Sequence, residues 1–204
     1  YTVTVSFLLR EKTLWAEAGH EVAFGQYVYS VEGAEKAPVS GVEIVRSLHN
    51  IGVRGENFEV MFSVLNGGLV SYKYAGREMI EAIPKPNFWR APTDNDCGNQ
   101  MPMRYAQWKI ASMYASHKEF RKGMYGPSNA PETTVHDNSV EVAFTYIMPT
   151  TPVSECRLAY EVFGDGRVKT ILTYDPVKEL GDMPEFSVLF KFNADYDHVK
   201  WYGL

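Results

Sequence analysis

The sequence predicts an all-β protein, and three observations support this. In most segments apolar and polar residues alternate with a period of two, as in strands that have one buried face. Short breaks rich in Gly and Asn separate several of these segments, which is typical of hairpin turns. Only one segment, residues 102–114, instead has apolar residues at helical spacing.

Two predicted strands open the chain, Tyr1–Phe7 and Val22–Tyr29, and Lys12–His20 between them is predicted to be a long crossing loop. The segment Gly33–Pro38 is small, polar and contains proline, which makes it the best linker candidate. We therefore expect residues 1–33 to be the last two strands of one domain and residues 37–204 to form another.

The second predicted domain is again built of strands. They are Val42–Arg46, Asn57–Val64, Leu69–Tyr74, Val140–Met148, Glu155–Phe163, Val168–Tyr174 and Glu185–Phe192. Tight hairpins are predicted at Asn66-Gly67-Gly68 and at Gly164-Asp165-Gly166, because Gly and Asn tolerate positive φ. Residues 115–139 are polar, with several Gly and Pro, and should hold a strand or two broken by loops.

One short helix is predicted over residues 102–114. Pro102 suits the first helical turn, and one face would be shared by Met103, Ala106 or Gln107, Ile110 and Tyr114. The helix follows directly on the polar run that ends at Gly98.

Composition limits the classes of function. A net charge of −5 gives no basic surface for nucleic acid or an anionic membrane. No apolar stretch approaches the ~20 residues of a membrane span, and no signal peptide opens the chain. The compartment is left open, with the cytoplasm favoured over export. The chain starts without Met inside a strand pattern and stops in an apolar run, so we interpret it as a piece of something longer.

The run Phe88–Gly98 crowds aromatics, a guanidinium, carboxylates, a proline and a glycine together. It predicts a loop that buried aromatics anchor and that presents polar groups at one place. The loop is either a structural corner or a ligand-facing surface. We expect Phe88 and Trp89 to form the anchor and a carboxylate, Asp94 or Asp96, to hold Arg90. The other Asp and Asn95 should cap local amides or the helix near Pro102.

No catalytic or metal-binding residue set is predicted. Glycoside hydrolysis uses two carboxyl groups across a sugar, whereas Asp94 and Asp96 belong to one loop. A calcium loop would need an oxygen ligand at Gly98 and a Glu at Tyr105, so an EF-hand is excluded, although a lone cation on the two carboxylates stays open. The five histidines match no zinc spacing, and the two cysteines suggest neither a disulfide framework nor a metal site.

Three motifs, in order, resemble the lactose-type β-galactosidases of glycoside hydrolase family 2. The first is Leu14–Gln26, which is similar to the end of that family's fourth, immunoglobulin-like domain. The second is Asn87–Gly98 followed by Tyr105–Lys109. The third, His198–Leu204, is similar to a strand of the C-terminal domain.

The resemblance implies a fold and a role. Residues 1–33 would close an immunoglobulin-like sandwich, and residues 37–204 would be the first part of a galactose-mutarotase-like β-supersandwich. The parent enzyme would hydrolyse terminal β-D-galactosides such as lactose, with catalytic glutamates on a preceding TIM barrel that nothing here matches. This region would support the barrel and the rim of the active site. A stand-alone carbohydrate-binding module of mutarotase-like fold is the alternative.

The resemblance also implies partners and cofactors. The partners would be the parent's remaining domains, its galactoside substrate and further copies in a homo-oligomer. No cofactor is expected in this region, whereas the parent family implies Mg and Na. Because the loop after the central motif can lie near the barrel's mouth in the family, it gives a candidate site-facing set. That set is Arg90, Asp94, Asn95, Asp96, Asn99 and Arg104.

Overall fold

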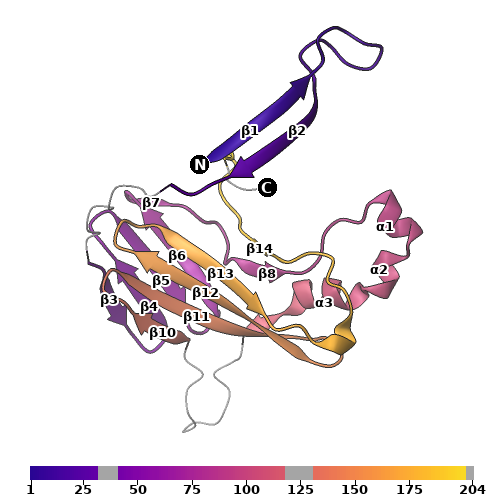
Figure 1. Ribbon diagram of the computed structural model, residues 1–204. Coiled ribbons are helices and arrows are strands. Elements are labelled where there is room, and N and C mark those ends of the chain that lie inside the picture. The colour runs from indigo at the N-terminus through magenta and orange to yellow at the C-terminus, as the bar shows by residue number, and fades with distance from the viewer. Residues whose placement is uncertain (32–40, 118–130, 201–204) are drawn as a thin grey trace. The chain divides into compact units, whose positions relative to one another are not determined.

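The computed structural model describes residues 1–31, 41–117 and 131–200, which divide into two compact units (Figure 1). The first unit holds residues 1–31 and 195–200, and the second holds residues 41–194. The predicted linker Gly33–Pro38 and the motif's end, Trp201–Leu204, lie outside the described residues. The domain limits 1–33 and 37–204 therefore stay a prediction.

The strands of the first unit form a two-stranded antiparallel hairpin. Its strands β1 (Thr2–Leu8) and β2 (Glu21–Val28) pair with Val3 opposite Tyr27. The backbone N–H of Leu9 donates to the His20 carbonyl at 2.8 Å, and that of Gly19 donates to the Leu9 carbonyl at 2.8 Å. The expectation of a crossing loop over Lys12–His20 is wrong, because these bonds make it the closed end of a hairpin.

The second unit contains two five-stranded antiparallel sheets, and the predicted all-β sandwich is confirmed (Figure 1). The first sheet has the order β3 (Glu43–Arg46), β4 (Asn50–Arg54), β5 (Phe58–Ser63), β6 (Gly68–Tyr74), β7 (Arg77–Glu78). The second has the order β10 (Glu132–Val135), β11 (Ser139–Met148), β12 (Ser154–Phe163), β13 (Val168–Tyr174), with β9 (Ser116–His117) beside β11. A separate pair joins β8 (Lys85–Asn87) to β14 (Ser187–Leu189).

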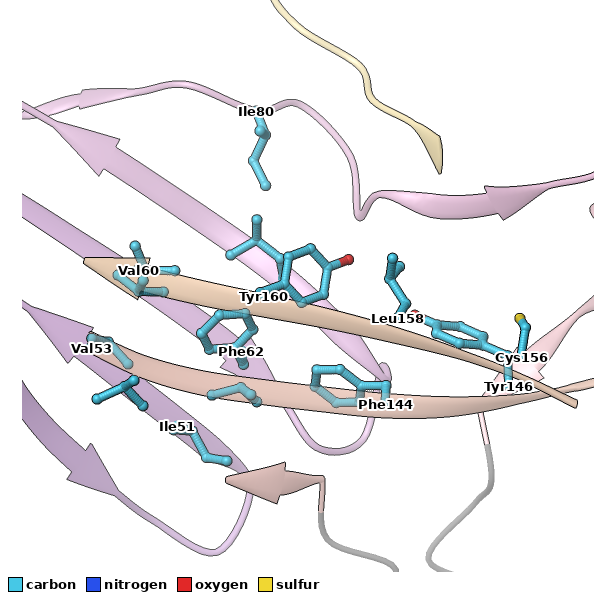
Figure 2. Close-up of a cluster of buried hydrophobic side chains, with 14 of the residues drawn as sticks. Ile51, Val53, Val60, Phe62, Ile80, Phe144, Tyr146, Cys156, Leu158 and Tyr160 are labelled. Atoms are coloured by element: carbon cyan, nitrogen blue, oxygen red, sulfur yellow. The ribbon is translucent and has the colours of Figure 1, made fainter. Parts of the chain in front are cut away.

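The core lies between these sheets and follows from strand periodicity. Alternate residues of β11 and β12 are fully buried, and register places Val142 opposite Tyr160. On the facing sheet Val53 lies opposite Val60. The Phe62 ring lies 5.5 Å from that of Tyr160, centroid to centroid, so side chains of both sheets meet (Figure 2). Each such side chain contributes roughly 1.5–3 kcal/mol by leaving water.

Three short helices replace the one predicted. They are α1 (Asp94–Gly98), α2 (Met101–Arg104) and α3 (Ala106–Tyr114). The expected loop Asp94–Gly98 is thus helical, and Gln100, at a φ of 57°, turns the chain before α2. The predicted apolar face is also wrong, because Met103, Ile110 and Tyr114 are exposed.

The buried face of α3 is instead formed by Trp108 and Ala111. The Trp108 ring packs 5.9 Å from that of Phe88, so the largest apolar side chain of the segment determines which face is buried. The helix is interrupted at Tyr105, between α2 and α3, so residues before and after it do not share one helical face. The prediction assumed one continuous helix over residues 102–114 and therefore chose the wrong face.

The remaining differences concern short strands. β4 and β8 were not predicted, because Gly52 interrupts one and Pro86 lies within the other. The predicted strand Glu185–Phe192 narrows to β14, preceded by the short 3-10 helix η1 (Lys178–Leu180). Of residues 115–139, the described part holds β9 and β10, and the glycines of residues 118–130 lie outside it.

Candidate functional site

The central motif is anchored by aromatic packing, as predicted. Phe88 is fully buried, its ring is 5.9 Å from Trp108, and its backbone N–H donates to the Ser112 hydroxyl at 2.8 Å. Trp89 is half-buried and packs against the core. Asn87 donates from Nδ2 to the Trp89 carbonyl at 2.9 Å and to the Ser187 hydroxyl at 3.1 Å. The motif therefore starts from a fixed base between β8, β14 and α3.

Arg90 is held by a carboxylate, as predicted, and the partner is Asp96. Arg90 Nη2 donates to Asp96 Oδ1 at 2.9 Å and Nη1 donates to Oδ2 at 2.5 Å. Both carboxylate oxygens accept a hydrogen bond, so the contact is bidentate. The side chains are 40% and 18% exposed, respectively, which makes this a partly solvated clasp.

Asp96 has a second role as part of a capping box. The Thr93 hydroxyl accepts from the Asp96 backbone N–H at 3.3 Å, while Asp96 Oδ2 accepts from the Thr93 N–H at 2.8 Å. These reciprocal bonds satisfy donors that the first turn of α1 would otherwise leave open. One carboxylate thus starts a helix and holds the guanidinium.

The electrostatics of the clasp favour the ionised forms. Hydrogen bonding from Arg90, and next from the Thr93 backbone N–H, holds the pKa of Asp96 well below its usual range. The hydrogen bond to Asp96 raises the pKa of Arg90 further. Asp96 is therefore an anion throughout the neutral range, fully occupied by its own chain.

Two other residues of the candidate set form a separate cluster. Arg104 donates from Nη1 to Asn99 Oδ1 at 2.9 Å and from Nη2 to the Tyr105 hydroxyl at 3.1 Å. The Tyr105 hydroxyl donates to Asp182 Oδ2 at 3.2 Å. This chain of bonds connects α1 and α2 to the segment after η1.

Asp94 and Asn95 lie on the exposed side of α1 and have no side-chain hydrogen bond or ion pair within the described residues. The expectation that they cap local amides or the helix near Pro102 is wrong, because Thr93 and Asp96 cap α1 and no side chain caps α2. The structure thus brings together Arg90 with Asp96 and Asn99 with Arg104, and leaves Asp94 and Asn95 open. Whether the six residues face a substrate stays a prediction.

The arrangement offers little for catalysis. Asp94 and Asp96 are two residues apart on one helix, a spacing at which side chains do not face each other, and Arg90 and Thr93 occupy Asp96. Within residues 1–31, 41–117 and 131–200, no group of three or more His, Cys, Asp and Glu is placed to hold a metal ion. No helix of that part is long and apolar enough to cross a membrane.

A cavity of the second unit lies elsewhere, between β6, β13 and the segment around Phe190. It encloses about 600 Å³, and its lining is mostly apolar, including Leu69, Ile80 and Phe192. Arg167 and Lys169 provide its charged groups, and no carboxylate of the part of the chain that the structure describes lines it. It therefore lacks the acid pair that glycoside hydrolysis uses.

Two family models match the chain. The model for the β-galactosidase small chain matches residues 54–204, and the model for β-galactosidase domain 4 matches residues 1–30. The chain belongs to the β-galactosidase small-chain family. The small-chain match begins inside β4 and extends through the rest of the second unit, so it includes the whole of the clasped motif.

Curated β-galactosidases are similar over almost all of the chain. The protein from Clostridium acetobutylicum is 35% identical over 208 residues, which cover 99% of this chain and 22% of the relative. That from Halalkalibacterium halodurans is 37% identical over 209 residues, with 100% and 20% covered. The β-galactosidase small subunit of Latilactobacillus sakei is 31% identical over 163 residues, with 76% and 51% covered.

The chain therefore spans about a fifth of the length of the first two relatives. In these proteins the matching region is one part of a larger chain. In the Latilactobacillus sakei protein it is half of a separately named subunit.

Sequence reasoning missed three participants in the site. Thr93 carried a usable signal, because Thr followed three residues later by an acid is a capping pattern. Tyr105 and Asp182 carried none, because they are 77 residues apart and only folding brings them together.

Proposed function

We propose that this chain is a non-catalytic part of a β-galactosidase that hydrolyses terminal β-D-galactosides such as lactose with retention of configuration. The observation that carries the proposal is the family match together with its extent. The chain aligns end to end with curated β-galactosidases while spanning about a fifth of their length. The catalytic carboxylates would then lie in the remainder of the parent chain.

In this role the second unit supports the catalytic domain and shapes the rim of its active site through the candidate set. The contacts of Arg90 with Asp96 and of Arg104 with Asn99 favour this role. They hold the motif in one conformation above the buried rings of Phe88 and Trp108. Any Mg or Na and any homo-oligomeric contact belong to the parent enzyme as a whole.

A deletion experiment tests the proposal. Removing the matching region from the Clostridium acetobutylicum β-galactosidase should abolish cleavage of o-nitrophenyl β-galactoside, and fusing this chain in its place should restore measurable turnover. The isolated chain should show none. Turnover by the isolated chain that a substitution within residues 1–204 removes would overturn the proposal.

The second candidate is a carbohydrate-binding module, and the aromatic-rich cavity near Phe190 favours it. Titration of the chain with galactose and lactose, followed by tryptophan emission, separates the two. Saturable binding in the millimolar range or tighter supports the module, and a flat titration supports the non-catalytic scaffold.

A further inference from the structure

A second cavity of about 330 Å³ lies where the β5–β6 turn, β8 and the α3–β9 corner meet. None of the candidate site residues lines it. Its polar lining comes from Asn66, Lys85, Ser112, Ser116, His117 and Tyr146. Among the described residues, the lining includes an ammonium group and an imidazole but no acidic side chain.

The cavity depends on two adjacent glycines in the β5–β6 turn. A Cβ at Gly67 would lie 2.1 Å from His117 Cγ, and one at Gly68 would lie 2.6 Å from Ile83 Cγ2 and 3.3 Å from the Tyr146 hydroxyl. Gly67 also has a φ of 67°, which other residues rarely adopt. The glycine pair thus allows His117, Ile83 and Tyr146 to close around one space.

The hydrogen-bonding inventory leaves several donors available. Tyr146 donates to the Gly67 carbonyl, and Ser112 donates to the Trp108 carbonyl at 2.9 Å, so these two are used. Within the described residues, the side chains of Lys85, Ser116, His117 and Asn66 have no hydrogen bond or ion pair, although the Asn66 backbone N–H donates to the Ser63 hydroxyl at 3.1 Å. A cluster of donors around one cation, without a carboxylate, is complementary to an anion.

The size and the apolar part of the lining define the ligand further. A volume of about 330 Å³ exceeds what a bare inorganic ion fills and is in the range of small-molecule sites, ~300–1,000 Å³. Ile83, Pro86, Met113 and Ala115 supply apolar surface for a carbon skeleton. We propose that this cavity binds a small organic oxyanion, a carboxylate or phosphate ester on a body about the size of a sugar ring, with Lys85 as the charged partner.

Calorimetric titration of the full chain at constant ionic strength tests this, with glucose 6-phosphate, glucuronate and uncharged glucose as probes. We expect saturable binding of at least one anion with Kd below roughly 10 mM, and none of glucose. The phosphate and carboxylate arms show which oxyanion is preferred. Absence of saturable binding for both anions would overturn the proposal, as would equal binding of glucose.

Lys85→Gln should weaken anion binding by about tenfold or more, as expected for loss of one charge-assisted contact. Lys109→Gln is the matched control, because Lys109 is an exposed lysine of α3 that does not line the cavity. Equal weakening by both variants would show a general charge effect and contradict the assignment. His117→Gln, which keeps a donor of similar length, should retain part of the binding.

Discussion

The hairpin β1–β2 and the sandwich of the second unit have the same strand pattern but differ in burial. In the hairpin, Val3, Val5 and Phe7 share one face and are 46%, 55% and 64% exposed. In the sandwich, Val53, Val60 and Phe62 are completely buried. Alternation therefore specifies a strand with an apolar face, whereas burial requires a second surface that the pattern itself does not provide.

The same contrast recurs at smaller scale within the second unit. A Cβ at Gly67 would collide with His117, while a Cβ at Gly76 would point into open space. Asp96 is engaged by Arg90 and Thr93, while its neighbour Asp94 is open. The two residues of each pair are of the same type, but only one of them is surrounded by other groups. The other residue can therefore serve as the control in an experiment.

The largest difference in stability is expected between substitutions of Phe62 in the sandwich and Phe7 in the hairpin. Phe62→Ala should lower the free energy of unfolding by about 3–5 kcal/mol, because it removes contacts with Phe144 and Tyr160 and leaves a cavity. Phe7→Ala should change it by about 0.5 kcal/mol or less. Urea unfolding of the full chain measures both. A similar cost for the two variants would mean that the hairpin face is covered in solution.

The next largest loss of stability is expected from substitutions at Gly67 and Gly76. Gly67→Ala and Gly76→Ala both impose a left-handed backbone on alanine, at a cost of about 1–2 kcal/mol. Gly67→Ala must additionally displace the His117 ring, so it should be the more destabilising of the two by thermal melt. If both variants melt alike, the β5–β6 turn has room to relax, and the close approach of His117 carries no energetic weight.

The strands were predictable because their information is local. The long strands β11 and β12 each bury one face, and the alternation of Val140–Met148 shows this directly. The turn Asn66-Gly67-Gly68 was equally predictable, because its residues tolerate the positive φ that Gly67 adopts. Fold class therefore followed from the sequence, and the resemblance to β-galactosidases supplied the family.

The site was only partly predictable. Pairing of Arg90 with a carboxylate followed from the cost of leaving a guanidinium beside buried aromatics, but sequence could not choose between Asp94 and Asp96. The choice depends on α1, whose five residues are too short for a periodic signal. The contact between Tyr105 and Asp182 depends on how distant segments pack, which no local pattern records.

The aspartate pair should differ in its response to acid. Because the folded-state pKa of Asp96 is depressed, its stabilising contribution is complete above its ordinary pKa of 3.8 and is lost as pH falls through the lower folded-state value. Asp96→Asn should therefore melt below the wild type at pH 7, with a gap that narrows below about pH 4. If the difference in melting temperature between the wild type and Asp96→Asn is constant from pH 7 to pH 2, the ionised carboxylate of Asp96 does not contribute the stability.

The smallest effect is expected from Asp94→Asn, and it decides what the open side of α1 is for. Asp94 has no side-chain partner within the described residues, so its loss should change stability by about 0.5 kcal/mol or less. An open carboxylate that costs nothing to remove is free to contact another surface. In the fusion enzyme described above, Asp94→Asn should then alter KM for o-nitrophenyl β-galactoside at unchanged melting temperature if the helix faces the rim. Unchanged KM and kcat alongside an unchanged melting temperature would remove Asp94 from the candidate set and leave the Arg90–Asp96 clasp as a purely structural corner.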